Sequence, residues 1–198
     1  MKNVIISLSL LLITFISFSQ TQADTSSSPH LSFKGVPIDG TLTEYVSKMK
    51  KSGFTLESTN DGIAILKGDF ASYKDCTIGV STLKQKDLVN KIAVLFPERD
   101  SWSSLSGNYF SLKEMLTEKY GKPVEVVEKF QNYEPKDDGS KMYQVKFDAC
   151  KYYATYEITK GTIYLSIDHD GVTSCFVRLV YFDKINGESI KKEAMKDL

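Results

Sequence analysis

The chain has 198 residues, and its 25 basic and 25 acidic side chains give a formal net charge of zero. That balance argues against a nucleic-acid-binding protein, which carries an excess or a stripe of basic residues. Hydrophobic residues make up 41% of the chain and charged residues 25%, as in ordinary globular proteins, which argues against disorder and against collagen-like or coiled-coil repeats.

The first 23 residues have the pattern of a secretory signal peptide. Lys2 is the only charged side chain in 1–23, and an uncharged run of about fifteen residues follows it. This run is shorter than the roughly 20 apolar residues that span a bilayer. A signal peptide is cleaved after a short segment of small residues, and cleavage after Ser19 or after Ala23 fits this rule. Because no cysteine precedes Cys76, we expect a periplasmic or secreted protein that is not a lipoprotein and has no transmembrane segment in its mature chain.

Turn signals and changes of period divide the remaining chain into four segments. They predict a flexible tether over 24–30, a first α+β unit over 31–100, a second α+β unit over 101–184, and a charged C-terminal helix or tail over 185–198. The Asn186-Gly187 pair predicts a turn at the start of the tail.

The first unit opens with Thr41-Leu42-Thr43-Glu44, a capping box in which the threonine and glutamate side chains satisfy exposed backbone amides. Apolar residues at helical spacing follow, and Gly53 ends the helix. The hydrophobic period then changes from 3.6 to 2 residues, as it does where a chain enters a sheet. The predicted strands are Phe54–Ser58, Gly62–Leu66, Asp75–Thr82 and Leu88–Phe96.

The second unit repeats this order of signals. Ser111-Leu112-Lys113-Glu114 is another capping box, and Gly121 ends the helix that it opens. Apolar residues at near-helical spacing already precede the box, so we expect a helix-loop-helix with its break at Gly107-Asn108. Asp137-Asp138-Gly139 predicts a turn among the strands that follow. These predicted strands are Val124–Phe130, Lys141–Phe147, Lys151–Thr159, Thr162–Asp168 and Thr173–Phe182.

The two units align with each other. Ile92, Val94 and Phe96 fall in register with Val177, Leu179 and Tyr181. The sequence therefore predicts an α+β protein of two tandem units, each a capped helix or helix-loop-helix packed on an antiparallel sheet of about four strands. An unrelated pair of α+β units is the alternative.

Three short segments carry a resemblance to known proteins. The helix end Glu118–Pro123, the strand lead-in Gly68-Asp69-Phe70 and the closing segment Val180–Lys184 resemble secreted Bacteroidetes proteins of unassigned function. The tandem helix-plus-four-strand plan also resembles the β-lactamase-inhibitor-protein-like fold of periplasmic and secreted proteins that bind other proteins. The first resemblance implies no activity, and the second implies protein binding without supplying contact residues, because no inhibitory loop matches.

Motifs with a known catalytic mechanism are absent from the sequence. Asp168, His169 and Asp170 are the best candidates for a metal or catalytic site, since two carboxylates flank an imidazole. The calcium-loop pattern fails, because its twelfth position is Leu179 rather than glutamate. A tight turn needs the same Asp and Gly residues, and we favour that interpretation.

The three cysteines allow a disulfide with one free thiol, or three buried thiols. Cys150 and Cys175 share the second unit and the same inward phase, so they are the preferred pair in an exported protein. A strand between them would hold them more than the roughly 7 Å between Cα atoms that a bridge allows. No base oriented for a nucleophilic cysteine is evident.

Alternation in the last three predicted strands gathers aromatic and cationic side chains on the side of the sheet opposite the core. The candidate binding residues there are Tyr153, Tyr164, Phe176, Arg178 and Phe182. Aromatic residues with arginine are typical of recognition surfaces. Two alternatives use the same residue types: these side chains could pack between the two units, or form ordinary cross-strand aromatic pairs.

These patterns predict an exported, non-enzymatic binding or accessory module, inhibitor-like in its action, whose partner is a protein, a peptide or a carbohydrate. No cofactor is expected. The alternatives are a metal-dependent or hydrolytic enzyme centred on Asp168, His169 and Asp170, and an envelope protein that associates with itself.

Overall fold

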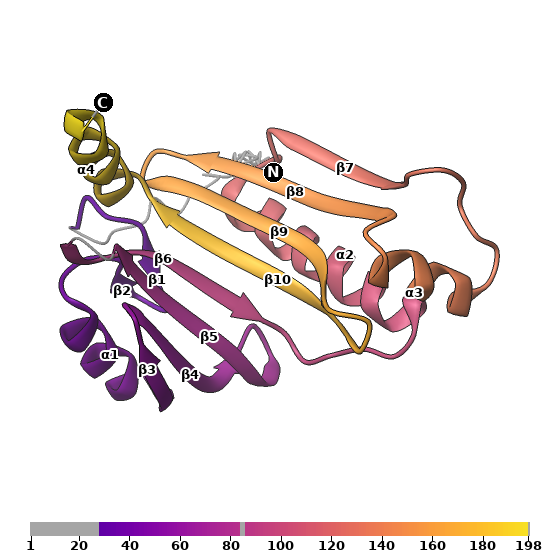
Figure 1. Cartoon of the computed structure of the whole chain (residues 1–198), viewed down its shortest axis with the longest axis horizontal. Coiled ribbons are helices and arrows are strands. Elements are labelled where there is room, and N and C mark those ends of the chain that lie inside the picture. The colour runs from indigo at the N-terminus through magenta and orange to yellow at the C-terminus, as the bar shows by residue number, and fades with distance from the viewer. Residues whose placement is uncertain (1–27, 84–85, 198) are drawn as a thin grey trace, which may run out of the picture.

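The computed structural model describes residues 28–83 and 86–197, so the predicted signal peptide and most of the tether lie outside the described residues. Figure 1 shows one long antiparallel sheet with helices against it. Its eight strands run in the order β3-β4-β5-β6-β10-β9-β8-β7, and β1 and β2 form a separate small hairpin. The fold is therefore α+β, as predicted, but the two expected sheets are one sheet, because β6 pairs with β10.

The strands are β1 (Ser32–Phe33), β2 (Val36–Pro37), β3 (Thr55–Asn60), β4 (Ile63–Phe70), β5 (Tyr73–Leu83), β6 (Lys86–Leu95), β7 (Glu125–Phe130), β8 (Cys150–Ile158), β9 (Gly161–Asp170) and β10 (Ser174–Asp183). Within the described part of the chain the helices are α1 (Leu42–Lys51), α2 (Trp102–Tyr120), α3 (Asp138–Lys146) and α4 (Lys184–Ala194), followed by a short 3₁₀ turn, Met195–Asp197.

Helix α1 begins where the sequence predicts. The Thr41 side chain accepts a hydrogen bond from the Glu44 amide, and the Glu44 carboxylate accepts one from the Thr41 amide, which completes the capping box. The apolar residues at helical spacing are buried on its inner side: Leu42, Tyr45, Val46 and Met49.

Helix α2 is continuous, so the predicted helix-loop-helix is wrong. Its N-cap is Ser101, whose side chain accepts from the Ser104 amide, and Ser111 lies inside the helix. A glycine within a helix costs only about 1 kcal/mol relative to alanine. Burial of five side chains along α2 outweighs that cost at Gly107: Trp102, Leu105, Tyr109, Leu112 and Leu116.

Residues 141–147 do not form the predicted strand. The Asp137 side chain accepts a hydrogen bond of 2.8 Å from the Ser140 amide and begins helix α3 in place of the expected turn. Met142 and Val145, three residues apart, are the apolar side chains that α3 buries. This spacing fits a helical turn, and a segment of seven residues is too short for periodicity alone to distinguish the two structures.

The C-terminal helix also starts earlier than expected. Asp183 caps α4, and its carboxylate accepts hydrogen bonds from the amides of Leu31 at 2.7 Å and Asn186 at 2.9 Å. Asn186 therefore lies inside the helix rather than in a turn, and its side chain donates to the carbonyl groups of Ile38 and Val89. His30, which was assigned to the tether, contacts the Asp183 carboxylate at 3.0 Å. This cluster ties the N-terminal segment to β6 and β10.

The hydrophobic core occupies one face of the sheet. Cross-strand registers place Val94 opposite Leu179 and Ile92 opposite Tyr181, so the buried residues of both halves share a face. They form one cluster with the inner sides of α1 and α2 and with Phe33 of the hairpin. Among the described residues, no helix is both long and apolar enough to cross a membrane.

Candidate binding face

The face of the sheet opposite the core, called here the outer face, is not covered by the helices of the described chain. Strand alternation and cross-strand pairing align its side chains in rows. The central row consists of Ser58, Ile65, Gly79, Ala93, Val180, Tyr164, Thr155 and Glu125. Since the two halves lie edge to edge in one sheet, the first half does not pack over the aromatic side chains of the second, contrary to the inter-unit packing that the sequence also allowed.

A hollow of about 380 Å³ lies on this face over β6, β10 and β9. Its lining residues are Lys91, Ala93, Thr162, Tyr164, Arg178, Val180 and Phe182. Ala93 faces Val180 across the β6–β10 pair. The neighbouring rows contribute longer side chains, Lys91 and Phe182 on one side and Arg178 on the other. The hollow exists because small side chains are surrounded by larger ones.

The polar groups around the hollow are rich in donors. The Arg178 guanidinium pairs with Asp168 at 2.7 Å, yet its Nε is buried without a hydrogen-bond partner. Ser166 faces Arg178 on β9, is 4% exposed, and has a side-chain oxygen without a partner as well. No carboxylate of the described residues pairs with Lys91. The unpaired Arg178 and Ser166 atoms are buried, so the donor without a partner that solvent reaches is the partly exposed Lys91.

A stacked tyrosine pair extends the face toward β7. The rings of Tyr153 and Tyr164 lie 5.5 Å apart with an interplanar angle of 29°. The Tyr153 hydroxyl donates to Glu125 at 2.8 Å, and this hydrogen bond raises the pKa of Tyr153. Burial raises the pKa of Tyr164. Both rings are held in place by the protein, which lowers the entropic cost of using them for contact.

The predicted binding residues are brought together only in part. Tyr164, Arg178 and Phe182 line the hollow, and Tyr153 stacks beside it. Phe176 is 8% exposed and does not line the hollow. Four lining residues were not among the predicted binding residues: Lys91, Ala93, Thr162 and Val180. The phase of Lys91 and Ala93 in β6 was readable from the sequence, but the pairing of β6 with β10 was not.

The candidate metal residues do not converge. Asp168 lies on the outer face and pairs with Arg178, whereas His169, the next residue in β9, points to the opposite face. The His169 ring contacts the Gly171 carbonyl at 2.7 Å and the Asp148 carboxylate at 3.2 Å, and these contacts raise its pKa. Among the described residues, no three His, Cys, Asp or Glu side chains are grouped so as to hold a metal ion.

All three cysteines are free thiols, so the preferred Cys150–Cys175 pair is not bonded in this structure. The physical reason is the strand order, since β9 separates β8 from β10. Burial raises the pKa of Cys150 to about 12 and that of Cys76 to about 11. Neither thiol is activated as a nucleophile, because a reactive cysteine needs a lowered pKa.

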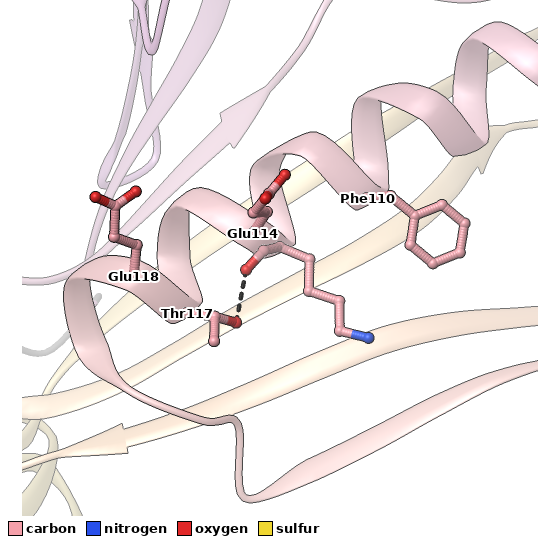
Figure 2. Close-up of a pocket in the computed structure, with 5 residues that line it drawn as sticks. Phe110, Glu114, Thr117 and Glu118 are labelled. Carbon is pink, nitrogen blue, oxygen red and sulfur yellow. Dashed lines mark hydrogen bonds between the residues drawn. The ribbon is translucent and has the colours of Figure 1, made fainter.

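A second hollow, of about 470 Å³, lies on the surface of α2 (Figure 2). All of its lining residues belong to this one helix: Phe110, Lys113, Glu114, Thr117 and Glu118. The Thr117 hydroxyl donates to the Lys113 carbonyl at 2.8 Å, and Lys113 pairs with Glu128 of β7. These polar groups already have partners, so this hollow is the weaker candidate.

Comparison with known proteins gives no further assignment: no protein-family model, curated protein or solved structure matches the chain.

Proposed function

We propose that this protein is an exported, non-enzymatic binding module that holds its partner on the outer face, at the hollow over β6, β10 and β9. The observation that carries this proposal is the open hollow itself, which combines aromatic walls with Lys91, a cation that no carboxylate of the described residues pairs. A fold needs a core on one face of a sheet, but it does not need Tyr164, Arg178 and Phe182 on the other.

The chemistry of the hollow favours a protein partner that presents an acidic side chain. Lys91 supplies a cationic group without an acidic partner among the described residues, and Arg178 supplies a second one that Asp168 already pairs. The side chains of Ala93, Val180 and Phe182 supply apolar surface between and beside them. A carboxylate would accept from the donors, while an apolar neighbour in the partner would cover Phe182, which is 41% exposed. An inhibitor or accessory protein of the periplasm or the cell exterior fits this mode of binding.

We also infer that the two halves are tandem copies of one unit. In each half a helix precedes four strands of the sheet, with α3 inserted in the second half. Val94 pairs with Leu179, its own counterpart in the alignment of the two units. If the two units are copies related by a two-fold axis between β6 and β10, the residues at the axis must pair with their own counterparts, as Val94 and Leu179 do. The topology therefore supports duplication and the resemblance to the β-lactamase-inhibitor-protein-like plan.

The test is capture of partners from envelope extracts on immobilised protein. The triple variant Lys91→Ala, Tyr164→Ala, Phe182→Ala removes a cation and two walls of the hollow. We expect it to lose a protein that the unmodified chain retains, by roughly tenfold or more in affinity, because central aromatic contacts often contribute about 2 kcal/mol.

The matched control is the double variant Lys67→Ala, Thr77→Ala, on the outer face of the first half and outside the hollow. It should retain the same protein. Equal capture by the triple variant, with an unchanged circular dichroism spectrum, would show that the hollow is not the binding site.

A further inference from the structure

The two edges of the sheet differ in a way that points to self-association. Strand β7 ends the sheet on one side and β3 on the other, and β7 forms the upper edge in Figure 1. An edge strand presents unpaired backbone groups on which another chain can add a strand.

Edge β3 is protected against such pairing. Its register with β4 is irregular between Leu56 and Ser58, and its side chains are polar and exposed apart from Leu56. Bulges and polar side chains discourage edge-to-edge pairing. Edge β7 keeps one register with β8 from Glu125 to Phe130, and the irregular contact is confined to its start, where the Val124 amide donates to the Thr155 carbonyl at 2.8 Å. Val124, just before β7, is 63% exposed, and Val126, within it, is 41% exposed. Of the two edges, β7 is the one prepared for a partner.

The hydrogen bonds of β7 show which of its backbone groups face outward. Gln131 donates to the Ala149 carbonyl at 2.9 Å. The pairs Lys129–Lys151 and Val127–Tyr153 lie two and four residues earlier in β7 and continue the same register, so they are the hydrogen-bonded pairs of this ladder. In an antiparallel ladder, the backbone groups of alternate residues point to the same neighbour. The amide and carbonyl groups of Val127 and Lys129 therefore point to β8, and those of Val126 and Glu128 point away from the sheet.

We propose that two copies of this protein pair through β7, antiparallel, about a two-fold axis at Val127. In this register Val126 of each copy exchanges backbone hydrogen bonds with Glu128 of the other. Val127 then faces Val127 of the second copy, and Glu125 faces Lys129 twice. A shift by two residues places Glu128 against Glu128 in one direction and Glu125 against Val127 in the other. Only the proposed register matches opposite charges.

The side chains involved are available for these contacts. Glu125, Val127 and Lys129 alternate onto the outer face, where directly opposed residues interact most strongly. Tyr153 holds one carboxylate oxygen of Glu125. No cation of the described residues pairs with Glu125, and no carboxylate pairs with Lys129.

The pairing continues the sheet across the two-fold axis, so the outer faces of both copies point to the same side. The two hollows over β6, β10 and β9 then lie on one extended surface. A partner with two suitable sites gains affinity from bivalent attachment without any new contact. The dimer itself does not depend on what the hollows bind.

Sedimentation velocity across a range of protein concentrations tests the pairing. We expect the purified chain to form dimers, and Lys129→Glu and Glu125→Lys each to weaken dimerisation roughly tenfold or more, because each variant creates two like-charge pairs. An equimolar mixture of these two variants should recover the dimer, since both facing pairs then carry opposite charges. Lys74→Glu, near the start of β5 and away from β7, is the charge-matched control and should dimerise normally.

Val126→Pro gives an independent test. The amide of Val126 faces away from the sheet, so proline there should leave β7 paired with β8. It removes the hydrogen bond that Val126 of each copy donates, which is two of the four across the proposed interface. A monomer with an unchanged circular dichroism spectrum is the expected result. A chain that is monomeric at all concentrations overturns the proposal, as does a dimer that persists in Val126→Pro or a mixture of the charge variants that stays monomeric.

Discussion

The two halves of the sheet are alike on the helix face and different on the outer face. On the helix face one row crosses six strands and is at most 1% exposed throughout: Leu66, Ile78, Val94, Leu179, Leu165 and Ala154. On the outer face, β4, β5 and β6 carry small, aliphatic and basic side chains such as Gly79, Ala93 and Lys91. Strands β8, β9 and β10 carry tyrosines, phenylalanines and an arginine there.

This difference separates the demands of folding from those of binding. Both halves must bury an apolar face under a helix, and both do so with residues of the same kind. The first half buries its core face without aromatic side chains on its outer face, so burial of a core does not by itself require them in the second. An asymmetry of this kind is what the proposed function leads us to expect.

The largest expected effect concerns the cluster that joins the halves. Asp183→Ala removes the cap of α4 and leaves the buried Leu31 amide without its acceptor. We expect the free energy of unfolding to fall by about 3 kcal/mol, the sum of a lost cap and an unsatisfied buried donor. Urea denaturation measures this change.

Asp183→Asn is the control for that substitution, because its amide oxygen can still accept from Leu31. It should cost clearly less than Asp183→Ala. Equal losses for the two variants would contradict this account, because a restored acceptor for the Leu31 amide would then recover no stability.

A pair of glycines compares the halves directly. A Cβ at Gly161 would lie 2.1 Å from the Phe182 carbonyl oxygen, whereas a Cβ at Gly79 would meet its nearest neighbour, the Ala93 side chain, at 3.9 Å. We expect Gly161→Ala to cost about 2–3 kcal/mol, as over-packing does, and Gly79→Ala to change stability by less than about 1 kcal/mol. Thermal unfolding of both variants measures the contrast, and similar melting temperatures would contradict it.

The smallest expected effect is a loss of stability in alkaline solution. Burial raises the pKa of Cys76, in the first half, to about 11 and that of Cys150, in the second, to about 12, from an ordinary value of 9.0. The unfolded chain releases these protons above about pH 9 while the folded chain keeps them. Stability is therefore fully present below pH 9 and falls as the pH rises toward 11–12.

Urea midpoints between pH 8 and pH 10 measure this effect, and the two cysteine variants separate it from the ionisation of unfolded tyrosines, whose ordinary pKa is about 10. Cys76→Ala and Cys150→Ala should each flatten the pH dependence relative to the unmodified chain. If neither variant does so, the two thiols are not protected by burial in the way that the structure indicates.

Much of the fold was predictable because the deciding signals are local. The Thr41 capping box depends on residues three positions apart, and the alternation in β8, β9 and β10 follows from the geometry of an extended chain. The same local signals failed where tertiary packing decided between two options. Burial of Trp102 and Leu105 kept α2 continuous past Gly107, and burial of Met142 and Val145 selected a helix for α3.

The candidate site divides in the same way. Alternation alone placed Tyr153, Tyr164, Arg178 and Phe182 on one face, since successive side chains of any strand point to opposite sides. Lys91 belongs to the site only because β6 pairs with β10, a contact between residues about 90 positions apart that no local pattern specifies.

His30, Asp183 and Asn186 gave no signal of their cluster for the same reason, since their contacts join the ends of the described chain. By itself the sequence determined which side chains share a face, because that is a property of the backbone period. The tertiary structure decided which faces lie side by side, because strand pairing depends on the packing of the whole chain.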